Sequence, residues 1–357
     1  MDEHIQYMHR CFHLAAHGRY TARPNPVVGA ILVYQGRIIG EGWHRMPGEP
    51  HAEVIAIRSV KDESLLSKST LYVNLEPCSH YGRTPPCSLL IIDKKIPKVV
   101  VSNLDPNPLV SGRGVHMLQS HQTEVITGVE EAKGWEINRH FFTYHTLKRP
   151  FIHLKWAESA DGFLAPRSQS SGHPILVSSP QSLRLAHQLR ASIQAILIGS
   201  KTAAVDNPSL TTRRVDGTNP LRFVVDRRRK LSESLKIFQS ENPAIRIVDR
   251  RYARKEDIAL RMTDDWTWLN ALMDELHHRN IQSLQVEGGA LILNSFISQG
   301  LWDEAWMIKS LTLFGDGVRG PAKDVIWPFY SHNFQSDTDT IFVFRKLLFP
   351  KQEISNF

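Results

Sequence analysis

The sequence predicts an α/β protein built from two domains. Apolar runs typical of buried strands alternate with segments of helical periodicity along both halves of the chain, which is the pattern of layered α/β folds. A length of 357 residues exceeds one typical domain and favours about two. With 41% hydrophobic and 22% charged residues, the chain has the composition of an ordinary globular protein.

The first half begins with a predicted amphipathic helix over 4–18, where apolar residues recur at helical spacing. Two strand-like runs separated by Gln35-Gly36 predict a hairpin. The two hairpin strands are predicted over 30–34 and 37–43. After them, the pattern predicts a helix over 52–60, a strand over 71–75, a helix over 88–93, a strand over 98–102, a short helix, a strand over 124–127, and a helix from 130 to about 145.

A domain boundary is predicted at Lys148-Arg149-Pro150, because the α/β alternation starts again at Phe151. We therefore expect one domain over 1–147 and a second over 148–357. In the second half, the pattern predicts strands over 151–156, 195–198, 222–225, 244–248, 283–286, 304–308 and 340–344, and helices over 180–191 and 266–279.

His51, Cys78 and Cys87 are predicted to bind one metal ion. One imidazole and two thiols leave one position of a tetrahedral zinc ion open, which is typical of a catalytic site. Glu53 follows His51 by two residues at a helix start, so its carboxylate can face the same pocket without binding the metal. This layout is that of a zinc hydrolytic deaminase, in which zinc activates water and the Glu carries protons. The cysteines are separated by eight residues, however, whereas the usual signature has two.

Three cysteines are too few for a disulfide framework, and two of them are already assigned to the metal. Cys11 is expected to be a core thiol, and the cysteine usage favours a reducing cytoplasm.

No apolar run approaches the roughly 20 residues of a membrane span, so no membrane partner is expected. The net charge of +7 fits anionic small substrates as well as nucleic acid. We interpret the dense basic run over 226–230 as a solvated face or a local phosphate contact.

The string from Leu75 to Cys87, with Gly-Arg-Thr-Pro-Pro between the cysteines, closely resembles the bifunctional pyrimidine deaminase/reductase family of riboflavin biosynthesis. The long gap between the cysteines distinguishes this family from other zinc deaminases. Further matches are Pro24–Gly29, Gly42-Trp43-His44 and Asp105-Pro106-Asn107-Pro108 with Gly112 and Gly114. The resemblance implies a cytidine-deaminase-like three-layer domain that replaces an exocyclic amine of a phosphoribosylated diaminopyrimidine with oxygen.

The second half is similar to the reductase domain of the same family. The resemblance implies a dihydrofolate-reductase-like fold that uses NADPH to reduce the ribosyl group to a ribityl chain. No Rossmann glycine fingerprint occurs in the chain. The matching stretches are Leu154–Gly162, Leu189–Ala191, Ile198–Thr202, Asp206–Leu210 with Arg213, Val224–Asp226 and Val286–Ala290.

The resemblance also implies site residues. Expected substrate contacts in the first domain are Asn25, His44, His80 and Arg83, of which Asn25 has amide groups suited to a heterocycle edge. Those in the second domain are Arg190, Leu210, Arg213 and Glu287, and the two arginines suit a phosphate. Lys155 and Glu287 are both candidates for proton handling, and Lys155 is the one selected as catalytic. Expected NADPH contacts are Ala157, Thr202, Asp206, Gly288, Gly289, Ala290, Leu291, Ile292, Leu293 and Asn294; the two glycines would let phosphate approach helix N-terminal amides.

One segment departs from the family pattern and keeps an alternative open. After Gly172 the family usually carries an acidic residue, Ser, one further residue, Trp and Ile, whereas this chain has His173-Pro174-Ile175-Leu176-Val177. An active deaminase with an impaired or non-catalytic second domain is therefore one alternative. A nucleic-acid-editing deaminase is another, although the second half lacks the common RNA-binding motifs. The expected partner is the small substrate, with no nucleic acid, and a homo-oligomer stays open.

Overall fold

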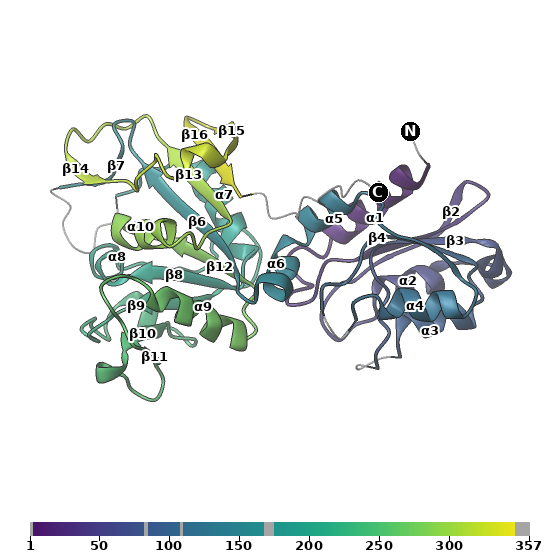
Figure 1. Cartoon of the computed structure of the whole chain (residues 1–357). Coiled ribbons are helices and arrows are strands. Elements are labelled where there is room, and N and C mark those ends of the chain that lie inside the picture. The colour runs from purple at the N-terminus through teal and green to yellow at the C-terminus, as the bar shows by residue number, and fades with distance from the viewer. Residues whose placement is uncertain (1–2, 82–84, 108–109, 168–174, 347–357) are drawn as a thin grey trace, which may run out of the picture. The chain divides into compact units, whose positions relative to one another are not determined.

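The computed structural model describes residues 3–81, 85–107, 110–167 and 175–346. The chain divides into two compact units, with the boundary between Leu147 and Lys148 (Figure 1). Within the described residues, no helix has both the length and the apolar character needed to cross a membrane.

The first unit contains one mixed sheet, which has five strands within the described residues, in the order β2-β1-β3-β4-β5. Strand β1 is antiparallel to both neighbours, and β3, β4 and β5 are parallel. Its elements are α1 (Glu3–Ala16), β1 (Gly29–Tyr34), β2 (Arg37–Trp43), α2 (Ala52–Ser59), η1 (Glu63–Lys68), β3 (Thr70–Leu75), α3 (Cys87–Asp93), β4 (Lys98–Asn103), α4 (Arg113–Ser120), β5 (Glu124–Ile126), α5 (Glu131–Ile137) and α6 (Arg139–Leu147).

Helices cover both faces of this sheet, which confirms the predicted three-layer arrangement. Figure 1 shows α2, α3 and α4 on one side and α1 and α5 on the other. Buried side chains such as Ile57, Ile91 and Leu118 fill the first interface. Met8 and Cys11 fill the second. Cys11 is 0% exposed, so its predicted role as a core thiol is confirmed.

Gly42 sets the position of α2 on the sheet. A Cβ at this position would lie 2.5 Å from the Ala56 nitrogen and 2.6 Å from the Ala52 oxygen. Because glycine has no Cβ, α2 can approach β2 closely. This contact places the N-terminal end of α2, and with it His51, at one end of the sheet.

The helix predicted from 130 to about 145 is wrong in one respect, because it is interrupted at Asn138. This side chain is buried and is used in a long-range contact. Its Oδ1 accepts a hydrogen bond from the Val27 nitrogen at 2.8 Å, and its Nδ2 donates to the Val27 oxygen at 2.9 Å. Helical periodicity continues past this residue, so the pattern alone does not reveal the break.

In the second unit, the main sheet has nine strands within the described residues, in the order β11-β10-β9-β8-β12-β6-β13-β16-β15. Following this order across the sheet, every strand from β11 through β10, β9, β8, β12 and β6 to β13 is parallel to its neighbour. The last two strands are antiparallel, since β16 pairs antiparallel with β13 and β15 pairs antiparallel with β16. The elements are β6 (Phe151–Glu158), β7 (Phe163–Pro166), α7 (Pro180–Ala191), β8 (Ala195–Gly199), α8 (Ser200–Asp206), β9 (Leu221–Val225), η2 (Lys236–Phe238), β10 (Ile245–Asp249), η3 (Arg250–Tyr252), β11 (Ile258–Leu260), α9 (Trp268–His278), β12 (Ser283–Glu287), α10 (Ala290–Ser298), β13 (Glu304–Lys309), β14 (Gly317–Arg319), η4 (Trp327–Phe329), β15 (Tyr330–Ser336) and β16 (Asp339–Arg345).

The two faces of this sheet have different roles. Helices α9 and α10 pack on one face, where Leu272 and Phe296 join the largest hydrophobic cluster. Helix α7 packs on the other through Leu185, and α8 packs on the same side through Ala203. Side chains alternate along a strand, so Lys155 of β6 and Glu287 of β12 point toward the α7 face.

The sequence predicted the buried central strands and missed most of the short or exposed elements. The elements that it missed include β7, α8, β11, β14 and the edge strand β15, which is exposed along most of its length. Pairing with a neighbouring strand, rather than local hydrophobic pattern, defines such strands.

Candidate functional site

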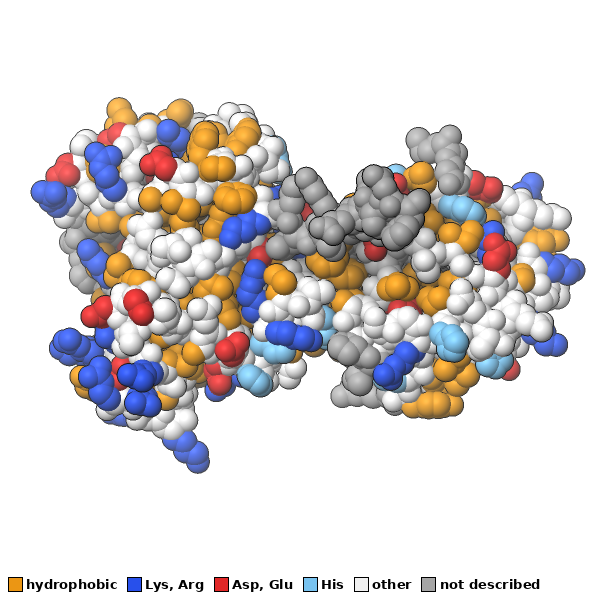
Figure 2. All heavy atoms as spheres, in the orientation of Figure 1, with side chains coloured by type: hydrophobic (Ala, Val, Ile, Leu, Met, Phe, Trp, Pro, Cys, Tyr) orange, Lys and Arg blue, Asp and Glu red, His pale blue; other side chains and the backbone are white. Residues whose placement is uncertain are grey.

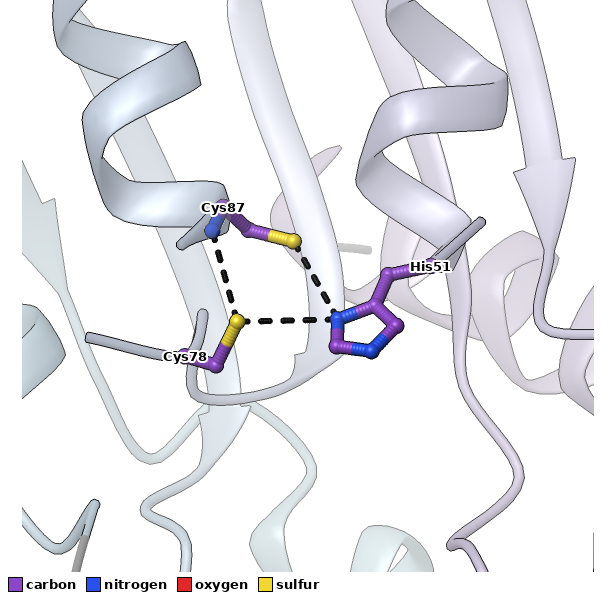
Figure 3. A group of neighbouring side chains, drawn as sticks. All are labelled: His51, Cys78 and Cys87. Carbon is purple, nitrogen blue, oxygen red and sulfur yellow. Dashed lines mark hydrogen bonds between the residues drawn. The ribbon is translucent and has the colours of Figure 1, made fainter. Parts of the chain in front are cut away.

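The three predicted metal ligands of the first unit come together at the ends of three segments (Figure 3). His51 immediately precedes α2, Cys78 lies in the loop after β3, and Cys87 is the first residue of α3. Their donor atoms all lie within 4.8 Å of one another. Among the described residues, this is the one such group of His, Cys, Asp and Glu side chains.

The spacing of the three donor atoms fits zinc. His51 Nδ1 lies 3.5 Å from Cys78 Sγ and 3.3 Å from Cys87 Sγ. Tetrahedral zinc, with Zn–S bonds of ~2.3 Å and Zn–N bonds of ~2.0 Å, would hold sulfur and nitrogen ligands about 3.5 Å apart. One nitrogen and two sulfurs also form the donor set of catalytic zinc sites with an open fourth position.

Hydrogen bonds favour the thiolate form of Cys78, whereas the hydrogen bond between the two cysteines raises the pKa of Cys87 well above its ordinary value. The side-chain hydrogen bond with Cys87 lowers the pKa of Cys78 to about 4, although burial acts in the opposite direction. The Cys87 backbone nitrogen also donates to Cys78 Sγ at 3.3 Å. The hydrogen bond to Cys78 in turn raises the pKa of His51 to about 9. Only neutral imidazole binds a metal, so metal binding here would release a proton.

Glu53 lies in the first turn of α2, two residues after His51, and is only 4% exposed. Burial raises its pKa above the ordinary value, against the opposing charge of His51. A carboxyl group in such a position can exchange a proton near neutral pH more readily than an exposed one.

Asn25 and His44, both predicted substrate contacts, form a pair beside the metal group. Asn25 Nδ2 lies 2.9 Å from His44 Nε2, and His44 Nδ1 lies 3.3 Å from the Pro50 oxygen. A carbonyl oxygen only accepts, so Nδ1 carries the hydrogen and Nε2 accepts from Asn25. Burial lowers the pKa of His44, which keeps this neutral form. The His44 ring lies edge-on to His51, with centroids 5.5 Å apart.

The other two predicted substrate contacts of this domain are His80 and Arg83. His80 is exposed two residues after Cys78. Arg83 falls within 82–84, outside the described residues.

Glu76, which is not among the predicted site residues, holds the Cys78 loop in place. Its buried carboxylate accepts four backbone hydrogen bonds of 2.9 to 3.2 Å. A Cβ at Gly114 would lie 2.0 Å from the Pro77 oxygen, so the two segments touch at this point. The sequence shows the two family motifs that contain Pro77 and Gly114, but it does not show that these motifs contact each other. The four donors are the nitrogens of Asp105, Gly112, Gly114 and Val115.

A cavity of about 910 Å³ lies in the second unit, at the carboxyl ends of the parallel strands β6, β8, β9 and β12. This is where open α/β sheets bind their ligands, and the volume is at the upper end of the usual ~300–1,000 Å³. Its lining includes Lys155, the predicted catalytic residue, and all four substrate contacts predicted for this domain, namely Arg190, Leu210, Arg213 and Glu287.

Glu287 is held as a carboxylate. Burial alone would raise its pKa, but the charges of Arg190 and Lys155 outweigh burial and hold the pKa below its ordinary value. Arg190 Nη2 lies 3.1 Å from Glu287 Oε2, and Lys155 is its register partner on β6. Gln285 also donates to this carboxylate.

The cavity contains a cradle that fits the phosphates of NADPH. Gly288, with φ +141°, leads into α10, whose N-cap is Gly289. The Gly289 nitrogen donates to Thr202 Oγ1 at 2.9 Å. A glycine N-cap has no side chain to cover the first turn, so amides of that turn can approach phosphate oxygens. Most of the predicted NADPH contacts line the cavity, namely Ala157, Thr202, Asp206, Gly288, Gly289, Ala290, Leu291 and Ile292.

Two predicted NADPH contacts do not line the cavity. Leu293 is 0% exposed and packs in the core, because the helix turns its side chain toward the sheet. Asn294 Oδ1 accepts a hydrogen bond from the Ala322 nitrogen at 3.0 Å.

The lining also includes residues that are not among the predicted contacts of the reductase site. Arg227 follows β9, and its place at the carboxyl end of a parallel strand could have identified it. Residues 262–264, Trp266 and Trp268 reach the cavity through tertiary packing, which no local pattern reveals. His187 of α7 lines it as well.

The segment that departs from the family pattern lies partly outside the described residues, since these omit 168–174. Its remaining residues, Ile175, Leu176 and Val177, line the cavity with aliphatic side chains.

Two arginines of the basic run over 226–230 are ion-paired. Figure 2 shows Lys and Arg side chains gathered over the β10–β11 end of the second unit, with acidic side chains nearby. Arg229 pairs with Asp257 and Glu256 at 2.9 Å. Arg227 pairs with Asp264. Such neutralised arginines do not form the continuous basic track of a polynucleotide site.

Comparisons with known proteins cover both units. A model of the cytidine and deoxycytidylate deaminase zinc-binding region matches residues 1–103, and a model of the RibD C-terminal domain matches residues 150–324. The riboflavin biosynthesis protein RibD of Aquifex aeolicus is 38% identical over 318 residues, which are 87% of this chain and 88% of that protein. The RibD of Escherichia coli is 34% identical over 332 residues, 88% of this chain and 89% of that protein.

Solved structures agree with these relatives. Acinetobacter baumannii RibD superposes with a TM-score of 0.85 at 30% identity, covering 96% of this chain and 98% of that one. A deaminase/reductase from Thermotoga maritima gives a TM-score of 0.83 at 34% identity, covering 97% and 99%. The predicted fold class, a deaminase-like domain followed by a reductase domain, is confirmed.

Proposed function

The chain belongs to the family of the riboflavin biosynthesis protein RibD, and from this membership we propose which residues perform each of its two reactions. It is a bifunctional enzyme of riboflavin biosynthesis, a deaminase and a reductase that uses zinc and NADPH. Its substrate is a phosphoribosylated pyrimidine. We assign deamination to the unit before Lys148 and reduction to the unit after it. The observation that carries the proposal is the spacing of the His51, Cys78 and Cys87 donor atoms, with Glu53 buried beside them.

For deamination, His51, Cys78 and Cys87 would hold zinc. When bound, zinc supplies the Lewis acidity that activates a water molecule for attack on the ring. Glu53 would take a proton from that water and deliver it to the departing amine. Asn25, oriented by His44, would bind an edge of the pyrimidine. His80 and Arg83 stay predicted contacts for the substrate.

For reduction, the cradle at Gly288 and Gly289 would hold the phosphates of NADPH, which supplies a hydride. Arg190 and Arg213 would bind the substrate, with Arg213 on its phosphate. Opening the ribosyl ring leaves a new hydroxyl oxygen that must gain a proton. Glu287 is ionised and cannot supply it, whereas the Lys155 ammonium beside it can. We therefore assign the proton donor to Lys155.

The free thiols Cys11, Cys78 and Cys87 support a cytoplasmic location, which stays a prediction. A homo-oligomer likewise stays open.

One experiment tests both halves of the proposal. Purified full-length protein is analysed for metal and then supplied with the phosphoribosylated diaminopyrimidine and NADPH. We expect about one zinc per chain, release of ammonia, and one NADPH oxidised for each ammonia released. Ammonia release without NADPH oxidation would favour the alternative in which the second domain is not catalytic, which the aliphatic segment over 175–177 motivates.

Lys155→Met is expected to lower kcat for reduction by at least ~10²-fold, because general acid catalysis contributes this much or more. The dissociation constant for NADPH, measured by fluorescence titration, should change little. Lys255→Met, which removes an exposed lysine outside the cavity lining, is the matched control. An unchanged kcat in Lys155→Met would assign the proton transfer to another group.

A further inference from the structure

His187 occupies a position in the reductase cavity that the assigned residues do not explain. It lies on α7, is 5% exposed, and lines the cavity. Its Nδ1 accepts a hydrogen bond from the backbone nitrogen of Arg213 at 3.1 Å. The two residues are 26 positions apart, so this bond joins α7 to the loop after α8.

This bond requires a neutral imidazole with its hydrogen on Nε2, because a protonated ring has no acceptor. The charged groups around the ring favour that form. Burial, followed by the charges of Arg190, Arg213 and Arg214, lowers the pKa of His187 to about 4, and the opposing charge of Glu287 is not sufficient to restore it. The hydrogen bond is therefore present throughout the neutral pH range.

The loop that His187 holds is conformationally strained. Asn207, with φ +42°, is the left-handed C-cap of α8, a place that asparagine commonly takes, whereas Leu210 has φ +54°, in the left-handed region that residues of its kind rarely adopt. Such residues persist only where surrounding contacts determine the backbone. Leu210 is buried, so its side chain supplies one of those contacts.

Helix α7 supplies two further contacts to this loop from one face. His187 and Arg190 are three residues apart and therefore lie on the same side of the helix. Arg190 Nη1 donates to the Thr211 oxygen at 2.9 Å, while its Nη2 reaches Glu287. Arg213 itself donates through Nη1 to Ser209 Oγ and remains exposed at the cavity. His187 thus holds the backbone of an arginine whose side chain is accessible to ligand.

We infer that His187 is a positioning residue for the substrate phosphate, which it serves by holding the Arg213 backbone so that the guanidinium faces the cavity. This inference rests on the proposed function, in which Arg213 binds that phosphate. Loss of the acceptor leaves the Arg213 nitrogen without its partner and releases the strained loop. The effect should appear in phosphate recognition and not in hydride transfer.

The test compares His187→Gln with His187→Asn in the full-length protein. Asparagine can place its amide oxygen near the position of Nδ1, whereas glutamine places its amide near Nε2 and loses the bond. For His187→Gln we expect KM for the deaminated phosphorylated substrate to rise about tenfold, in line with the loss of a buried hydrogen bond. The value of kcat should stay within about twofold, and His187→Asn should restore most of KM.

Two further measurements separate positioning from a general structural effect. KM for the same substrate without its phosphate should be the same in the wild type and in His187→Gln. The dissociation constant for ribose 5-phosphate, measured by calorimetry, should rise about tenfold with His187→Gln, and far less with His187→Asn. An equal rise in KM for both substrates, or no rise in either KM or the dissociation constant, would overturn the inference.

The calorimetric measurement does not depend on turnover. If the wild type failed to oxidise NADPH, the proposed reductase activity would be wrong, and ribose 5-phosphate binding would still decide the role of His187. Thermal unfolding and the deamination rate of each variant report whether the chain is folded.

Discussion

Glu53→Gln is expected to abolish deamination while zinc stays bound. Glutamine has nearly the same shape as glutamate, so the packing at the start of α2 should change little. It cannot carry a proton between water and the departing amine, however. Because general acid–base catalysis contributes ~10²–10⁴-fold, we expect the rate of ammonia release to fall by at least ~10²-fold. Ammonia release and zinc content are measured on the same preparation.

The matched control for this change is Glu49→Gln, which removes a carboxylate two residues before His51 rather than two residues after it. Its deamination rate should stay near that of the wild type. Retained turnover in Glu53→Gln would refute the proton-transfer role. Loss of zinc together with activity would instead indicate that Glu53 supports the metal site.

Cys78→Ser is expected to lose zinc and deamination together, because serine is a poor ligand for zinc compared with thiolate. The cavity of the reductase lies entirely in the other unit. NADPH oxidation on supplied deaminated intermediate should therefore continue at a rate within about twofold of the wild type, since sites that share no residues act nearly independently. The measurements are zinc content, ammonia release and NADPH oxidation.

Cys11→Ala is the control for removing a thiol. This cysteine is buried in the core of the same unit and lies outside the metal group, so zinc should be retained. The cost should be limited to about 1 kcal/mol of stability from the lost packing. If Cys78→Ser lost both activities while remaining folded, the assignment of one reaction to each unit would be wrong.

The metal site was predictable because its ligands follow recognisable element boundaries. His51 precedes a helix pattern, Cys78 follows a strand pattern, and Cys87 opens the next helix. In a parallel α/β arrangement such boundaries meet at one end of the sheet, so the sequence order implies proximity. The Arg190–Glu287 pair was not predictable in this way. Its geometry, and hence the ionised state of Glu287, depends on how α7 packs on the sheet.

The interruption at Asn138 illustrates the same limit for secondary structure. Its local sequence is compatible with a continuous helix, but the side chain instead bonds to the backbone of Val27, 111 residues away. Tertiary hydrogen bonds of this kind override local propensity.

The sequence by itself predicted the zinc ligands His51, Cys78 and Cys87, the proton-carrying role of Glu53 and the boundary between two α/β halves. Through the eight-residue gap between Cys78 and Cys87 it also indicated the family. These features are encoded in residue type and spacing along the chain. Only the tertiary structure decided that Glu76 joins the Cys78 loop to the segment over 105–115. It also showed that His187 accepts a hydrogen bond from the Arg213 backbone nitrogen. Both side chains accept hydrogen bonds from backbone N–H groups, which every residue except proline has, so the identity of the donor residue carries no signal for these contacts.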